Sequence, residues 1–177
     1  KLKIKHKVPT LIISAFIVAE LCFYLACNVP FPVHSNVYYN SVEEIFTAFN
    51  KNDNLNAVIE GENSVMCVGN NRVYYYSKTD KGYQFAPNNP THMLADIDTK
   101  ECRVLVRRYL DTNDFYVIIS SNNFGEMNVS DNKNSHFSIV ADSIPTLSEK
   151  DYHYYTCINN FSNYVVTADN HKIIICK

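Results

Sequence analysis

The sequence contains no tryptophan and only four glycines in 177 residues. So few glycines cannot supply a G-x-G-x-x-G or P-loop cradle for nucleotide phosphates, and neither a G-x-S-x-G elbow nor an H-E-x-x-H zinc motif occurs. No C-x-x-C pair is present either, so a redox motif and a zinc knuckle have no support. These absences disfavour most classes of metabolic enzyme, and we expect no catalytic activity, no metal and no cofactor.

Basic residues are scarce beyond the N-terminus. Residues 1–29 hold four of the 16 lysines and arginines and one of the 18 aspartates and glutamates, which leaves 12 basic and 17 acidic residues, a net charge of −5, in the rest. A domain of this sign is unsuited to bind nucleic acid or an anionic lipid surface. We therefore expect no nucleic-acid partner.

One long apolar run is present, Val8 to Val29, directly after a lysine-rich start. Its 22 residues, at about 1.5 Å each, can cross a hydrocarbon core of about 30 Å as one helix. The four lysines on its N-terminal flank predict a cytoplasmic N-terminus. We expect residues 1–29 to be a basic flank and a single-pass anchor in the cell membrane, with the C-terminal domain extracytoplasmic.

Two other interpretations of this run stay open. Tyr24-Leu25-Ala26-Cys27 resembles a lipobox, which would make the protein a lipoprotein acylated at Cys27, although Tyr24 stands where an aliphatic residue is usual. A cleaved secretory signal is the second, but its apolar region usually spans only roughly 7 to 15 residues. Glu20 lies inside the span, where a carboxylate is costly, so it is a candidate contact to a membrane-protein partner.

The composition favours strands. Thirteen tyrosines among β-branched neighbours are typical of sheets, and the many asparagines suit turns. Ser41-Val42-Glu43-Glu44 is a capping box that predicts a short amphipathic helix ending near residue 50. We predict an α+β, β-dominated fold: the transmembrane helix, a linker over 30–40, and a domain over 41–177 with one helix and an antiparallel meander or sandwich of about 8 to 10 strands.

Short turn-rich gaps separate the expected strands, which lie at 57–60, 64–69, 72–78, 82–85, 102–110, 115–121, 136–141, 152–158, 163–168 and 171–176. Residues 87–98 are expected to be irregular or briefly helical, and residues 122–135 to be an exposed loop. The last three strands are expected to pair in chain order, with Asp169-Asn170 as the final hairpin turn.

Six cysteines are present, two in the apolar run and four beyond it, at 67, 102, 157 and 176. Cys67 and Cys102 share strand faces with valines, so they are expected in the core, and the four outer cysteines are expected to be mostly unbridged thiols. His153 and Cys157, with His171 and Cys176 nearby in sequence, could instead form a metal site or a Cys–His nucleophile pair. Buried thiols and edge histidines are the simpler interpretation.

Two rows of tyrosines occur in the expected strands, at 74–76 and 152–155. Tyr74, Tyr76, Tyr152 and Tyr154 are the candidate ligand-binding residues, because tyrosines that face outward can stack on sugar rings or line a protein interface. Cross-strand packing of these rings is the alternative.

Residues 1–85 combine a lysine-rich start, one apolar span, a capped helix and Glu60-Gly61-Glu62-Asn63-Ser64 before a tyrosine-rich hairpin. This combination resembles small, largely uncharacterised membrane-anchored extracytoplasmic proteins of AT-rich Gram-positive bacteria. We therefore expect a membrane-anchored binding or interaction module. Two alternatives stay open: a regulatory or immunity-type partner of a membrane complex, contacted through Glu20, and a cell-envelope hydrolase or thiol enzyme that uses Cys157 with His153 or His171.

Overall fold

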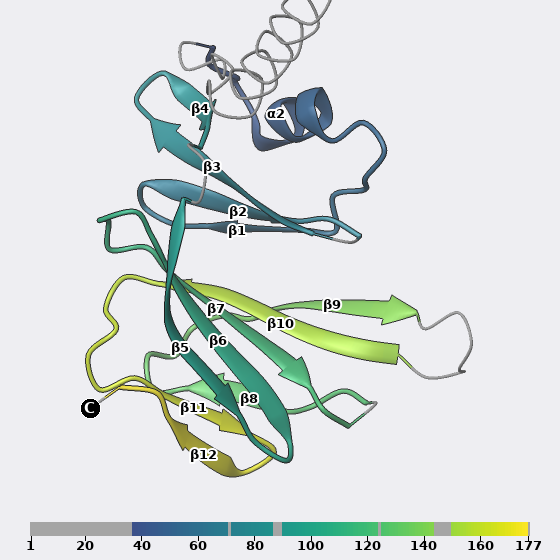
Figure 1. Cartoon of the computed structure of the whole chain (residues 1–177), viewed down its shortest axis with the longest axis vertical. Coiled ribbons are helices and arrows are strands. Elements are labelled where there is room, and N and C mark those ends of the chain that lie inside the picture. The colour runs from purple at the N-terminus through teal and green to yellow at the C-terminus, as the bar shows by residue number, and fades with distance from the viewer. Residues whose placement is uncertain (1–36, 71, 87–89, 124, 144–149, 177) are drawn as a thin grey trace, which may run out of the picture. The chain divides into compact units, whose positions relative to one another are not determined.

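The computed structural model describes residues 37–70, 72–86, 90–123, 125–143 and 150–176, within a compact unit that spans Ser35–Lys177. These residues form twelve strands in three antiparallel sheets and one short helix (Figure 1). The predicted β-dominated fold is confirmed, although the strands outnumber the expected set. The predicted anchor, its Glu20 and Cys27, and residues 30–36 of the linker lie outside the described residues. Within the described part, no helix is long and apolar enough to cross a membrane.

Helix α2 (Val42–Phe49) begins at the predicted capping box. The Ser41 hydroxyl accepts a hydrogen bond from the Glu44 backbone N–H at 3.2 Å, and the Glu44 carboxylate accepts one from the Asn40 N–H at 2.9 Å. The first bond satisfies an amide group that the first turn leaves without a partner, and the second holds the residue before the N-cap on the start of the helix. The buried side chains of Val42, Ile45 and Phe46 then fix the helix on its neighbouring sheet.

Sheet A contains β1 (Ala57–Glu60), β2 (Ser64–Val68), β3 (Val73–Thr79) and β4 (Gly82–Phe85), paired in chain order as predicted. Strand β2 is buried along its whole length because it is covered on both faces. Val65 and Cys67 pack in the same cluster as α2, whereas Met66 and Val68 pack in the cluster shared with sheet B.

Sheet B has the order β5-β6-β7-β10-β9 and contains β5 (Thr91–Asp98), β6 (Cys102–Tyr109), β7 (Phe115–Ser121), β9 (Ser138–Ser143) and β10 (Lys150–Ile158). The β6–β7 hairpin is as predicted, but β5 corrects the expectation of an irregular segment over 87–98. The register shifts between Met93 and Ala95, so Leu94 is an extra residue in a bulge. A bulge interrupts the two-residue alternation by which a strand is recognised in sequence.

Sheet C has the order β12-β11-β8 and contains β8 (Val129–Asp131), β11 (Val165–Ala168) and β12 (His171–Ile174). The β11–β12 hairpin is as predicted, with Asp169 and Asn170 at φ values of 44° and 71°. The expected pairing of residues 152–158 with 163–168 is wrong, because β10 lies between β7 and β9. The expected loop over 122–135 contains β8, whose Asp131 accepts a hydrogen bond from the Tyr164 hydroxyl at 2.9 Å.

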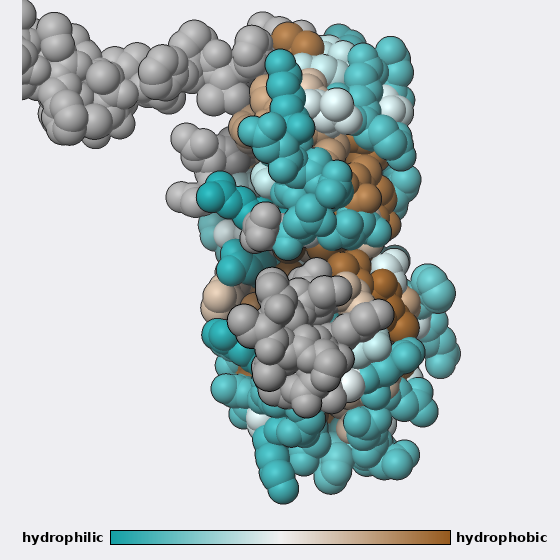
Figure 2. Space-filling model, turned by 90° about the vertical axis from the view of Figure 1, so that its right-hand side faces the viewer, coloured by the Kyte–Doolittle hydropathy of each residue, from teal (hydrophilic) through white to brown (hydrophobic). Residues whose placement is uncertain are grey.

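Sheet B is the middle layer, with sheet A on one face and sheet C on the other (Figure 1). Tyr116 and Tyr155 point into the core shared with sheet A, whereas Val117 and Tyr154 point into the core shared with sheet C. The strands therefore form a layered sandwich rather than one meander. The outer surface is mainly hydrophilic in the view of Figure 2, with separate hydrophobic areas.

Candidate functional site: a recess beside Tyr74

A recess of about 560 Å³ lies where α2 ends and β3 begins. It is lined by Phe49, Asn50, Lys51, Asn52, Asp53, Arg72 and Tyr74. Helix α2 supplies the first of these residues, the loop that follows it supplies the next four, and β3 supplies the tyrosine. Of the four tyrosines that the sequence suggested, Tyr74 is the one that lines this recess.

Asp53 fixes one wall of the recess to the turn between β2 and β3. Its carboxylate accepts hydrogen bonds from the backbone N–H groups of Asn54 at 2.9 Å and Asn70 at 2.7 Å, and from the Tyr74 hydroxyl at 2.8 Å. A side chain at Gly69 would overlap this carboxylate, so the close approach requires glycine.

The hydrogen bonds of Asp53 also lower the pKa of its carboxyl group and so favour the charged form. Partial burial raises the pKa of Asp53, but the bonds from Asn70, Tyr74 and Asn54 outweigh this effect, and the nearby Arg72 adds to them, so the pKa stays below its usual value. For Tyr74 the pKa is raised, first by burial and then by its bond to the Asp53 carboxylate. The wall therefore carries a negative charge that is already held by three donors.

Asn50 fixes the opposite wall through the core. Its side-chain amide donates to the Tyr76 hydroxyl at 2.7 Å and to the Phe46 carbonyl at 3.1 Å. Tyr76 is only 1% exposed, which corrects the expectation that it faces outward to a ligand. Tyr76 shares the α2 face of β3 with Tyr74 and packs among the residues under α2, and its hydroxyl positions the Asn50 side chain.

The remaining lining residues give the recess two positive charges. Lys51 and Arg72 are exposed, while Phe49 and Tyr74 are half-buried. Two cations, side-chain amides and aromatic surface can together bind a ligand that has an apolar face and an anionic group.

The other two candidate tyrosines lie elsewhere. Tyr154 is 1% exposed and donates a hydrogen bond to the Met127 carbonyl at 2.9 Å, so the expectation that it faces a ligand is wrong. Tyr152 is half-buried against the same core between sheets B and C. The structure therefore does not bring the four tyrosines into one site, because the two rows lie in different sheets.

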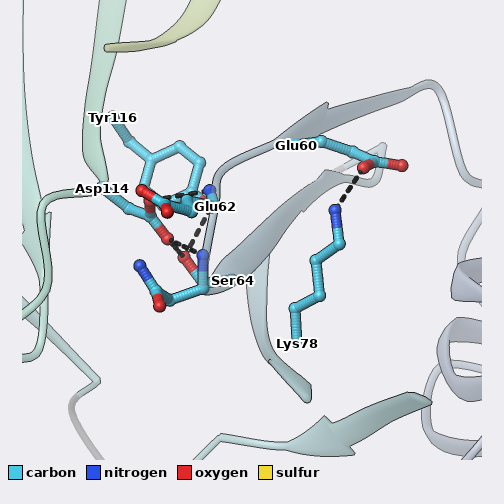
Figure 3. Close-up of polar contacts among 7 residues, drawn as sticks. Glu60, Glu62, Ser64, Lys78, Asp114 and Tyr116 are labelled. Atoms are coloured by element: carbon cyan, nitrogen blue, oxygen red, sulfur yellow. Dashed lines mark hydrogen bonds and ion pairs between the residues drawn. The ribbon is translucent and has the colours of Figure 1, made fainter. Parts of the chain in front are cut away.

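A second recess, of about 530 Å³, lies at the Glu60–Ser64 segment. It is lined by Glu60, Gly61, Glu62, Asp114, Lys133, Ser135, Cys157, Ile158 and Asn159. Asp114 is 1% exposed and accepts hydrogen bonds from the N–H groups of Glu62 and Asn63, both at 2.8 Å, and from the Ser64 hydroxyl at 2.6 Å (Figure 3). The Ser64 hydroxyl also lies 2.8 Å from that of Tyr116. All three donors point to the carboxylate, so this arrangement holds the β1–β2 turn on β7.

The candidate cysteine and histidines lie in two different sheets, with Cys157 and His153 in sheet B and His171 in sheet C. The Cys157 thiol has its pKa raised to about 12, mainly by burial and then by Asp114. His153 shares a strand with Cys157, and its Nδ1 lies 2.9 Å from the Ser120 hydroxyl. His171 lies in sheet C, with Nε2 3.9 Å from a Glu101 carboxylate oxygen. Burial therefore disfavours the reactive thiolate form of Cys157.

The structure also separates the residues of the alternative metal site. Cys157 belongs to the core between sheets A and B, whereas His171 and Cys176 belong to the sheet C side of the molecule. Among the described residues, no three His, Cys, Asp or Glu side chains are grouped closely enough to hold a metal ion. Cys67, Cys102 and Cys157 are free thiols, and Cys67 and Cys102 are fully buried, as predicted.

Comparison with known proteins adds no relative. The chain matches no protein-family model, no curated protein and no solved structure.

Proposed function

We propose that the protein is a single-pass, membrane-anchored extracytoplasmic binding module whose ligand site is the recess beside Tyr74. The apolar run from Val8 to Val29, with four lysines before it, supports the anchor and its orientation. The recess itself carries the binding part of the proposal. It joins aromatic surface, amides and two cations in a volume of about 560 Å³, within the range of roughly 300–1,000 Å³ that is usual for small-ligand sites.

The walls of the recess support this proposal because they are held before any ligand arrives. Asp53 fixes the β2–β3 turn and Tyr74, and the Tyr76 hydroxyl fixes Asn50. A site that is rigid in advance loses less conformational entropy when it binds.

The chemistry of the lining favours an acidic sugar as the ligand class. Tyr74 and Phe49 offer apolar surface to the carbon–hydrogen face of a sugar ring, and the side chains of Asn50 and Asn52 supply polar groups at the same rim. Arg72 is placed to bind a carboxylate through its planar guanidinium group. The Asp53 carboxylate already accepts three hydrogen bonds, so it competes only weakly with a ligand carboxylate for Arg72.

The test compares N-acetylmuramic acid with N-acetylglucosamine, which lacks the carboxylate. Saturation-transfer NMR on the full chain in detergent micelles should detect the acid more strongly than the neutral sugar. Arg72→Gln should remove this difference, and Tyr74→Ala should abolish binding of both sugars. Arg103→Gln is the matched control, because Arg103 is an exposed arginine that pairs with Asp96 on sheet B, outside the recess.

Two outcomes would contradict the proposed site. One is absence of transfer to either sugar from a folded wild-type chain. The other is equal loss of binding in Arg72→Gln and Arg103→Gln, which would show a nonspecific charge effect rather than a defined recess.

A further inference from the structure

The first described residues, 37–40, are fixed to the edge of sheet A. The Tyr39 N–H donates to the Tyr83 carbonyl at 2.8 Å, and the Tyr83 N–H donates back to the Tyr39 carbonyl at 2.9 Å. Gly82 has a φ of 114°, and a side chain there would meet the Tyr39 carbonyl. Glycine therefore allows the two segments to approach, and the position where the chain enters the folded unit is defined by β4.

Apolar side chains are exposed at this entry position. Val37 and Tyr38 are 39% and 40% exposed, and they are consecutive in the sequence. The Lys81 ammonium lies 5.5 Å from the centroid of the Tyr38 ring, a cation–π arrangement. An aliphatic residue, a tyrosine and a lysine together are typical of side chains at the interface between a bilayer and water, where apolar parts insert and polar ends stay hydrated.

The length of the chain keeps this group close to the bilayer. The predicted span ends at Val29, eight residues before Val37. Even fully extended, eight residues reach no further than about 30 Å. A bilayer is therefore always within reach of Val37 and Tyr38, at a high effective concentration.

We propose that Val37, Tyr38 and Lys81 form a juxtamembrane patch that lies in the headgroup layer of the bilayer. This inference rests on the proposed anchoring of the chain. The contact does not depend on anionic lipid, because residues 30–177 carry a net charge of −5, from 12 basic and 17 acidic residues. Insertion of the apolar side chains holds the patch, so it binds a neutral bilayer as well.

The absence of tryptophan allows a direct test, because Tyr38→Trp gives the chain a single tryptophan. The full-length variant is placed in phosphatidylcholine vesicles whose acyl chains are brominated close to the headgroup. Bromine should reduce the fluorescence by about twofold or more compared with unbrominated vesicles, and the emission should be shifted to the blue, as expected for a ring in the interface. Val37→Trp provides a second reporter in the same patch in case Tyr38→Trp does not fold.

Ile174→Trp is the matched control, because Ile174 is an aliphatic residue on β12 that is 56% exposed. Its fluorescence should be the same in both kinds of vesicle. Equal quenching of the patch and control reporters, or quenching of neither, would overturn the proposal. A blue shift without quenching that grows with the protein-to-lipid ratio would indicate contact with a second copy and would also overturn it.

An alkaline carbonate wash of the vesicles separates this proposal from the anchor on which it rests. Protein that stays with the vesicles but shows no quenching contradicts the juxtamembrane patch alone. Protein that the wash removes contradicts the anchor, and with it the patch.

Discussion

Replacement of Asp114, which directly precedes β7 and binds the β1–β2 turn, should destabilise the fold more than the loss of any side chain within that turn. The carboxylate is 1% exposed and binds three donors, the Glu62 and Asn63 N–H groups and the Ser64 hydroxyl. In Asp114→Ala the two backbone donors lose their partner, while the Ser64 hydroxyl keeps its hydrogen bond with the Tyr116 hydroxyl. Hydrogen bonds to a charged group contribute about 1.5–3 kcal/mol each, so the loss of two should lower the free energy of unfolding by about 3–6 kcal/mol.

Asp114→Asn should cost roughly half as much. The amide oxygen of asparagine can replace the carboxylate oxygen that binds Asn63 and Ser64, but its NH₂ group then faces the Glu62 N–H. One hydrogen bond is lost and two donors face each other. The expected order of stability is therefore wild type, then Asn, then Ala.

Gly61 supplies an independent check on this arrangement. A Cβ atom at Gly61 would lie 2.5 Å from the Asp114 carboxyl carbon, and that short side chain is held by three bonds and cannot move aside. Gly61→Ala should therefore cost about 1–3 kcal/mol in the wild-type chain. In Asp114→Ala the obstructing carboxylate is gone, so the same change should cost less than about 0.5 kcal/mol.

Urea unfolding of the four chains of this cycle, followed by far-ultraviolet circular dichroism of the detergent-solubilised full chain, measures these differences. We predict a clear coupling energy between positions 61 and 114. Additive effects of the two changes, or an Asp114→Ala chain as stable as wild type, would refute the view that the carboxylate holds the turn.

Three further outcomes follow. The hydrogen bonds of Asp53 lower its folded-state pKa below the usual value, so the unfolded state binds more protons in acid, and the stabilisation present above about pH 4 is lost as pH falls further. Asp53→Asn should therefore flatten the pH dependence of the urea midpoint between about pH 5 and 3. Burial, with Glu43 nearby, raises the pKa of the Cys67 thiol to about 12, so iodoacetamide should leave Cys67 unmodified in the folded chain. Mass spectrometry after alkylation in denaturant without reductant should find at least two modified sites among the four outer cysteines. Protection of all four until reductant is added would show two disulfides. Co-purification of a membrane partner should be lost in Glu20→Leu and kept when only the outer tyrosines are changed, and equal recovery from both variants would count against a contact at Glu20.

Local signals in the sequence predicted the elements whose stability is local. The Ser41 capping box gave the helix, and the short turns around Asp80-Lys81 and Asp169-Asn170 gave hairpins that the structure confirms. Sheet order depends on contacts between residues far apart in the chain, which neither periodicity nor turn residues encode. Strand β8 has only three residues, and its place beside β11 depends on Asp131, which binds a tyrosine 33 positions away.

The site was predictable in part. The tyrosine row at 74–76 indicated binding residues, but only a three-dimensional view separates Tyr74, which lines the recess, from the buried Tyr76. The sequence does not indicate Asp53 or Asp114, because a loop aspartate carries no sign of its distant donors. Glycine was the available signal: in a chain with four glycines, Gly61 and Gly69 bracket β2, and each lies against one of these carboxylates.

The most direct test is to determine on which side of the membrane the β-sandwich lies. Intact bacterial cells that express the full chain are treated with protease, and the surviving fragments are identified by mass spectrometry. We predict that residues 37–177 are cleaved on intact cells while peptides from residues 1–29 stay protected. A domain that resists digestion on intact cells and is cleaved only after the membrane is broken would contradict it.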